Sequence, residues 1–65
     1  MAIYNEVKKL REEKNITQEE LAEKVGVSRQ TIIAMEKGNY TPSLMLALEL
    51  AEFFKLPVEK LFHIN

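Results

Sequence analysis

The strongest signals of local structure in this chain lie in residues 17–38, T-Q-E-E-L-A-E-K-V-G-V-S-R-Q-T-I-I-A-M-E-K-G. Thr17 and Glu20 have the spacing of a capping box, in which the threonine hydroxyl accepts from the Glu20 N–H and the carboxylate accepts from the Thr17 N–H. Gly26 ends this first helix, because glycine adopts the left-handed conformation at little cost. Ser28 follows almost at once and is a second N-cap. The sequence therefore predicts two short helices joined by a tight glycine turn.

The second of these helices runs to about residue 37 and turns several polar side chains outward. With Ile32 pointing inward and about 100° per residue, Arg29 lies at the edge of the outer half. Arginine and glutamine have paired donors and acceptors that match the edges of guanine and adenine. The residues on the outer half are Gln30, Ile33, Ala34 and Lys37.

Two short helices with a tight turn between them form a helix-turn-helix unit, here residues 17–37, which places its second helix in a DNA major groove. Within such a unit we expect Arg29 and Gln30 to contact bases, although on an unrelated helix both would be ordinary solvated residues. Ile33 and Ala34 are expected beside them, where they either meet thymine methyl groups or contribute little.

A long ordered run of residues extends this pattern on both sides. It reads L-R-E-E-K-N-I-T-Q-E-E-L-A-E-K-V-G-V-S-R-Q-T-I, then M-E-K-G-N-Y-T-P-S-L, then L-F near the end of the chain. Over roughly residues 4–62 the chain resembles the Cro/C1-type, lambda-repressor-like (XRE-type) helix-turn-helix family. The resemblance implies an all-α, five-helix domain over residues 1–65 that binds operator DNA, usually as a two-fold dimer.

Several further polar residues are candidate contacts to the DNA backbone, which set the register of a complex and carry no sequence information. Ser28 and the free N–H groups at the helix start suit a phosphate. The resemblance implies that Gln18 holds a phosphate through its side chain and its N–H; a plain helix-start residue is the alternative. It also implies contacts from the loop after Gly38, although Tyr40 can equally pack on the core. The expected phosphate contacts are Thr17, Gln18, Ser28, Lys37, Asn39 and Tyr40.

A salt bridge is expected between the first helix, over roughly residues 4–14, and the second helix of the unit. Arg11 follows Leu10 at the edge of one apolar face, and Glu36 flanks Met35 at the edge of the other. The resemblance implies that Arg11 and Glu36 pair and brace the DNA-reading helix. The alternative is that both side chains are simply exposed to solvent.

Two more helices complete the expected bundle, one capped by Ser43 and running to residue 54, the other over residues 57–62. Apolar residues cover more than one stripe of the longer helix, so it is central in the core or has a second covered face. Those around the shorter helix exceed what it can bury internally, which favours a homodimer over a monomer with an apolar surface. The expected dimer interface consists of Phe53, Leu56, Pro57, Val58 and Leu61.

The two ends of the chain are short β-prone stretches, residues 2–4 and 62–64. They predict a small two-stranded ribbon beside the bundle, with fraying ends as the alternative. His63, the only histidine, is expected at the surface rather than as a metal ligand or a proton shuttle.

Composition excludes several classes of function. The chain has 65 residues and no cysteine, so we expect one domain without a disulfide or a thiolate metal site. It offers no nucleophile elbow, phosphate loop or metal-spaced cluster, and no residues left over for a small-molecule pocket. No signal peptide or membrane span appears, which leaves the cytoplasm as the default location. We therefore expect no catalytic activity, cofactor, metal ion or membrane partner.

These features together predict a sequence-specific DNA-binding regulator, most simply a repressor, that binds double-stranded DNA as a homodimer at a pseudo-palindromic operator. The net charge of −1 is unusual, because a DNA-binding domain generally carries a basic surface. It leaves open a protein-interaction module, such as an antitoxin or an adaptor with the same fold. Salt-dependent affinity for DNA distinguishes the two roles.

Overall fold

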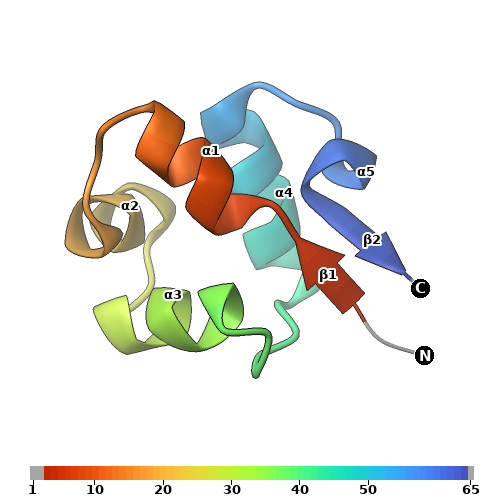
Figure 1. The fold of residues 1–65 in the computed structure, drawn as a ribbon, viewed down its shortest axis with the longest axis horizontal. Helices are drawn as coiled ribbons and strands as arrows, with labels where there is room; N and C mark the ends of the chain where they lie inside the picture. The colour runs from red at the N-terminus through yellow and green to blue at the C-terminus, as the bar shows by residue number, and fades with distance from the viewer. Residues whose placement is uncertain (1–2, 65) are drawn as a thin grey trace.

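Five helices and two terminal strands form residues 3–64, the part of the chain that the computed structural model describes (Figure 1). The predicted five-helix bundle with a small ribbon is confirmed. The elements in chain order are β1 (Ile3–Asn5), α1 (Val7–Glu13), α2 (Gln18–Val25), α3 (Arg29–Glu36), α4 (Leu44–Phe54), α5 (Val58–Leu61) and β2 (Phe62–Ile64).

The helix-turn-helix unit, α2 and α3, has the helix ends that its local sequence predicts. The Thr17 hydroxyl accepts from the Glu20 N–H at 3.0 Å, and the Glu20 carboxylate accepts from the Thr17 N–H at 2.7 Å. Gly26 ends α2 in the left-handed conformation, with φ of 76°. Ser28 then caps α3 by accepting from the Thr31 N–H at 3.2 Å. These local bonds hold the tight turn between the two helices.

Helix α4 supplies the largest share of the core, as its wide apolar surface predicted. Ser43 caps it by accepting from the Leu46 N–H at 3.1 Å, and its inner face packs against α2 and α5. Full burial of a large apolar side chain contributes roughly 1.5–3 kcal/mol, so the core holds each helix by its inner face. The largest wholly buried side chains are Val7, Leu21, Ile32, Met35, Leu50 and Leu61.

The two ends of the described chain pair as an antiparallel ribbon, so the predicted pairing is confirmed. Tyr4 lies opposite His63, and Asn5 lies opposite Phe62. Figure 1 shows the ribbon beside the bundle, with both ends of the described chain on the same side of the molecule. Of the predicted first strand, Ala2 lies outside the described residues.

The ribbon corrects two predicted helix boundaries. Helix α1 begins at Val7 rather than at residue 4, because Tyr4 belongs to β1. Helix α5 ends at Leu61, because Phe62 turns to extended backbone and starts β2. Both errors have one cause: strand pairing joins residues that are distant in sequence, and no local pattern reveals it.

Candidate nucleic-acid interface

Helix α3 has one buried face and one open face. Ile32 and Met35 are wholly buried, whereas Arg29 and Gln30 in the first turn are exposed. Figure 1 shows α3 along one edge of the molecule, with no other element beyond it. The two side chains expected to read bases therefore point away from the core and are accessible to a partner.

Ile33 and Ala34, the other two expected base contacts, are half-buried. Their side chains offer only methyl and methylene groups, so they suit the thymine methyl group and cannot hydrogen-bond to a base. Any polar reading by this helix therefore depends on Arg29 and Gln30 in its first turn.

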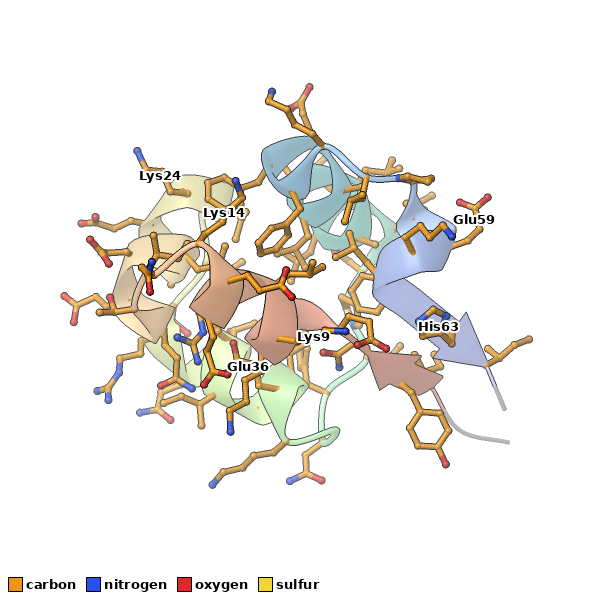
Figure 2. The ribbon with its side chains drawn as sticks, turned by 45° about the horizontal axis from the view of Figure 1, so that its top comes forward. Lys9, Lys14, Lys24, Glu36, Glu59 and His63 are labelled. Carbon is orange, nitrogen blue, oxygen red and sulfur yellow. The ribbon has the colours of Figure 1, made fainter. Side chains whose placement is uncertain are left out.

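A bidentate ion pair ties α3 to α1. Arg11 Nε donates to Glu36 Oε2 at 2.7 Å, and Arg11 Nη2 donates to Glu36 Oε1 at 3.2 Å. Arg11 Nη1 also donates to the Ile16 carbonyl at 2.9 Å, just before α2. The Arg11 and Glu36 side chains are only 11% and 4% exposed, and Figure 2 shows Glu36 between the ribbons of α1 and α3. The structure thus brings together the two residues expected to pair, and neither is simply exposed.

Arg11 is charged under all ordinary conditions, and the ion pair raises its pKa further. Hydrogen bonding to Glu36 is the largest influence and raises the pKa of Arg11; burial opposes it, and the charges of Glu36 and Glu12 add to the rise. A cation whose pKa rises on folding contributes its full stability below its unfolded pKa and loses it only as the pH passes the folded value. Since that value lies above the ordinary pKa of arginine, the contribution of Arg11 is complete across the neutral range.

Gln18 joins the same carboxylate, a contact that the sequence did not indicate. Its Nε2 donates to Glu36 Oε1 at 3.0 Å, so Glu36 is bonded to both α1 and α2. The Gln18 amide is therefore partly engaged inside the protein rather than directed only at a phosphate. Its second amide hydrogen and its N–H at the start of α2 remain available for that role.

Thr17 and Ser28 stand at the N-termini of α2 and α3. Their hydroxyl oxygens accept the capping bonds from the backbone of Glu20 and Thr31. A hydroxyl that accepts in this way retains its own hydrogen as a donor, and both residues are exposed. The Ser28 hydroxyl also lies 3.1 Å from the Thr31 hydroxyl, and either of these two can be the donor. Each helix start also presents N–H groups that favour an anion, so both sites can hold a phosphate without losing their caps.

The loop between α3 and α4 carries the other expected backbone contacts. Gly38 has φ of 82°, and the Asn39 N–H donates to the Ala34 carbonyl at 2.9 Å, which closes the end of α3. Lys37 and Asn39 are exposed. Tyr40 is 41% exposed, so its ring lies at the surface and not in the core, which was the alternative for this residue.

Asn5 contacts α3 from the terminal ribbon, and sequence reasoning did not single it out. Its Nδ2 donates to the Met35 carbonyl at 2.9 Å, in the last turn of α3. Its Oδ1 accepts from the Val7 N–H at 3.1 Å, at the start of α1. An asparagine just before an apolar helix position is a weak capping signal. The contact to α3, across 30 residues of sequence, has no local signal at all.

The expected dimer interface needs one correction. Leu61 is wholly buried, because α5 packs it into the chain's own core, and it offers no surface to a second chain. Phe53, Leu56 and Val58 are half-buried and pack against the same core, and Pro57 is exposed. The apolar surplus around α5 is therefore smaller than the sequence suggested.

The two most exposed large apolar side chains of residues 3–64, Leu44 and Met45, lie instead on the outer face of α4, with Leu48 on the same helix. Leu44 is 75% exposed, Met45 is 73% exposed and Leu48 is 53% exposed. Glu49 and Glu52 border them on the same helix. Because this face is apolar and acidic, it does not suit a phosphate backbone, and α3 remains the candidate DNA-binding surface.

Other kinds of site are not found in the described part of the chain. Within residues 3–64, no group of three or more acidic, histidine or cysteine side chains is placed to hold a metal ion. No helix there has the length and apolar content that crossing a membrane requires. Every buried polar side-chain atom of these residues has a hydrogen-bond partner, so no buried polar group is left pointing at a missing ligand.

Known proteins with similar sequences are regulators. A family model described as helix-turn-helix matches residues 7–61. An uncharacterised HTH-type transcriptional regulator from Methanocaldococcus jannaschii is 57% identical over 58 residues, which are 89% of this chain and 88% of that protein. The cryptic phage CTXphi transcriptional repressor RstR from Vibrio cholerae is 37% identical over 57 residues, which are 88% of this chain and 51% of that protein.

A solved structure agrees with the sequence matches. A crystal structure from Bacteroides fragilis, described as that of a candidate DNA-binding protein, superposes with a TM-score of 0.82 at 30% identity. The alignment covers 94% of this chain and 98% of that one. The two sequence relatives are named as a transcriptional regulator and a transcriptional repressor, and the family consists of DNA-binding regulators rather than enzymes. From its sequence, its helix-turn-helix unit and this fold, the chain belongs to the Cro/C1-type helix-turn-helix family of transcriptional regulators.

Proposed function

We propose that this chain is a sequence-specific DNA-binding repressor that binds a pseudo-palindromic operator as a homodimer, with α3 in the major groove. Arg29 reads a guanine, and Gln30 reads an adenine or a neighbouring base. Ile33 and Ala34 lie beside them and face thymine methyl groups. A protein that binds over a promoter in this way represses by occupying it, so the repressor role needs no further domain.

One observation carries this proposal: the first turn of α3 is exposed while the rest of the helix is fixed. Arg29 and Gln30 are open to solvent, the inner face is buried, and Glu36 is bonded to both α1 and α2. Reading a base edge requires hydrogen-bonding groups held to within about 0.5 Å of the productive geometry. A rigid helix with an arginine and a glutamine on its open turn meets that requirement.

The proposed phosphate contacts use few charges. Of these residues only Lys37 is a cation, and the others offer hydroxyl, amide and backbone N–H donors. Each phosphate neutralised by a cation adds about −0.9 to the slope of log affinity against log salt. We therefore expect DNA binding that weakens with salt less steeply than is usual for basic DNA-binding proteins. The set is Thr17, Gln18, Ser28, Lys37, Asn39 and Tyr40.

A two-fold dimer would place two α3 helices in successive major grooves, about 34 Å apart. The exposed and half-buried apolar residues between α4 and α5 support this assembly, since a second chain would cover them. The proposed interface consists of Phe53, Leu56, Pro57 and Val58, without Leu61. The name of the related RstR, a transcriptional repressor, supports repression as the outcome.

The proposal is tested by selecting bound sequences from a random duplex library at a low and a moderate salt concentration. The mass of the complex formed with the selected duplex is then measured. We expect an inverted repeat, two chains on each duplex, and an affinity that falls as salt rises. Scattered sequences that are lost at moderate salt would overturn the proposal. They would favour a protein-interaction role, such as an antitoxin or adaptor.

A further inference from the structure

Asn5 connects three parts of the molecule that are distant in sequence. It lies in β1, opposite Phe62 of β2. Its Oδ1 accepts from the first N–H of α1 at 3.1 Å, and its Nδ2 donates to the Met35 carbonyl at 2.9 Å. One partner is a donor and the other is an acceptor, so the two bonds together fix the orientation of the amide. The amide supplies the donor and the acceptor from two different atoms of one short side chain.

The Met35 carbonyl belongs to the last turn of α3, where carbonyls lack partners within the helix. Local bonds close this end: Lys37, Gly38 and Asn39 donate from their N–H groups to the carbonyls of residues 33–35. The bond from Asn5 is of a different kind, because it comes from the other end of the chain. It ties the carboxyl end of α3 to β1.

The terminal ribbon, strands β1 and β2, is itself firmly anchored. The Glu6 N–H donates to the Leu61 carbonyl at 2.9 Å, and Leu61 is wholly buried. Phe62, the partner of Asn5, packs against the core. His63 Nε2 lies 3.4 Å from Glu6 Oε2, across the ribbon. The backbone that carries the Asn5 side chain is therefore held by contacts to α5, β2 and the core as well as by the bond to α3.

The segment matched by the family model, residues 7–61, stops short of both strands. The Asn5 end of this bond thus lies outside the segment that the family model matches, and the Met35 end lies inside it. Helix α3 is braced twice from the N-terminal region: Arg11 bonds the Glu36 side chain, and Asn5 bonds the backbone one residue earlier. Both braces act at the carboxyl half of α3, next to Lys37 and Asn39.

We propose that the terminal ribbon positions the DNA-binding helix, and that Asn5 is the positioning residue through which it acts. This inference rests on the proposed function for its consequence in DNA binding. Loss of the Asn5 bond lets the carboxyl end of α3 move relative to the rest of the helix-turn-helix unit. The proposed base contacts in the first turn and the backbone contacts near Lys37 then no longer fit one duplex together.

Asn5→Asp is the sharpest variant, because it is nearly isosteric. It retains an acceptor for the Val7 N–H but places a carboxylate oxygen against the Met35 carbonyl, where the donor stood. Asn5→Ala removes both bonds without adding a charge. Asn15→Asp is the matched control, since Asn15 is exposed and the added charge is the same. Asn15 has φ of 57°, a conformation that aspartate adopts as asparagine does.

The first measurement is amide hydrogen exchange in the full-length proteins without DNA. We expect Asn5→Asp and Asn5→Ala to lower protection of the Lys37, Gly38 and Asn39 amides about three- to tenfold, the equivalent of one hydrogen bond. The Leu50 amide in α4 and all amides of Asn15→Asp should keep their protection. Unchanged exchange at the end of α3 would overturn the proposal, as would an equal loss at Leu50, which would show general destabilisation.

The second measurement is the affinity for the selected operator and for a scrambled duplex, at a temperature where every variant is folded. We expect the ratio of the affinity for the operator to the affinity for the scrambled duplex to fall about tenfold for both Asn5 variants. The base contacts in the first turn of α3 and the backbone contacts near Lys37 then no longer fit one duplex together. An added negative charge alone weakens both duplexes alike and leaves the ratio unchanged. An unchanged ratio in both variants would overturn the role in DNA binding. If the wild-type chain bound no DNA, the proposed function would fail, and hydrogen exchange would still decide whether Asn5 positions α3.

Discussion

Arg29 carries most of the proposed base reading, because a guanidinium group can donate two hydrogen bonds to one guanine. It is exposed in the first turn of α3 and takes no part in the ion pair behind the helix. Its substitution should therefore change recognition and leave the fold intact. Lys37, at the other end of the helix, is a proposed phosphate contact and should behave differently.

Replacing Arg29 by Ala should weaken operator binding by roughly 1–3 kcal/mol and relax the preference at one base pair. Titration of operator and scrambled duplexes with both proteins measures the effect. The control is Lys37→Ala, which should weaken both duplexes by a similar factor. An equal loss on the two duplexes for Arg29→Ala would show that Arg29 does not read a base.

Arg11 and Glu36 form a bidentate ion pair that joins α1 to α3. Replacing Arg11 by Ala leaves a carboxylate that is 4% exposed with only Gln18 as a side-chain partner. Removing one partner of a buried pair typically costs about 3 kcal/mol or more, whereas an exposed pair costs less than about 1 kcal/mol. We expect the larger loss in urea unfolding, and a smaller one for Arg11→Lys, which cannot form the bidentate pair. A loss below about 0.5 kcal/mol for Arg11→Ala would contradict a bracing role.

The turn between α2 and α3 depends on the left-handed backbone conformation of one residue, Gly26. Gly26 has φ of 76°, and a Cβ atom added there would meet no atom within 4 Å. The cost of Gly26→Ala is therefore backbone strain without a clash, about 1–2 kcal/mol. Gly26→Asn should cost less, because asparagine tolerates this conformation better. Thermal unfolding measures the loss of stability in the two variants. Equal losses would mean that the left-handed φ at Gly26 is not the cause of the destabilisation.

The ends of α2, α3 and α4 could be predicted because each depends on neighbours in sequence. The hydroxyls of Thr17, Ser28 and Ser43 all accept from the N–H three residues on, and Gly26 supplies the left-handed stop. The ends of α1 and α5 could not, because the ribbon decides them. The sequence neighbours of Tyr4 predict a helix, whereas its pairing with His63 places it in a strand.

Features of the candidate DNA-binding surface also fall into two groups, those that the local sequence predicts and those that depend on packing. The faces of α3 follow from helical periodicity, so the exposure of Arg29 and the burial of Ile32 could be predicted from the sequence. The bonds from Gln18 and Asn5 to α3 join residues 18 and 30 positions apart. No sequence pattern near Gln18 or Asn5 predicts these bonds, because they form only when the elements pack together.

Which apolar side chains are buried also depends on how the whole chain packs. Leu61 was expected at a dimer interface and is buried in the chain's own core, while Leu44 and Leu48 on α4 are largely exposed. The sequence showed more apolar residues than one face of each helix can bury. It could not show which of them the fold leaves outside.

Replacing Pro57 by Glu tests the proposed dimer directly. Two-fold symmetry would place each new carboxylate near its counterpart, and facing like charges oppose association. The dimer dissociation constant should rise by about tenfold or more, as measured by sedimentation equilibrium. Leu48→Glu, on the exposed face of α4, is the control and should leave association unchanged. If only Leu48→Glu separated the chains, the interface would lie on α4 and the proposed one would be wrong.

The most direct test of base reading by α3 uses the selected operator with its guanines replaced one at a time by 7-deazaguanine. This base keeps its pairing and its minor-groove edge but lacks the N7 acceptor that faces the major groove. We predict that wild-type protein loses affinity at one guanine in each half-site, and that Arg29→Ala shows no further loss at that guanine. If the loss were the same in both proteins, or if no guanine mattered, the first turn of α3 would not be reading the major groove.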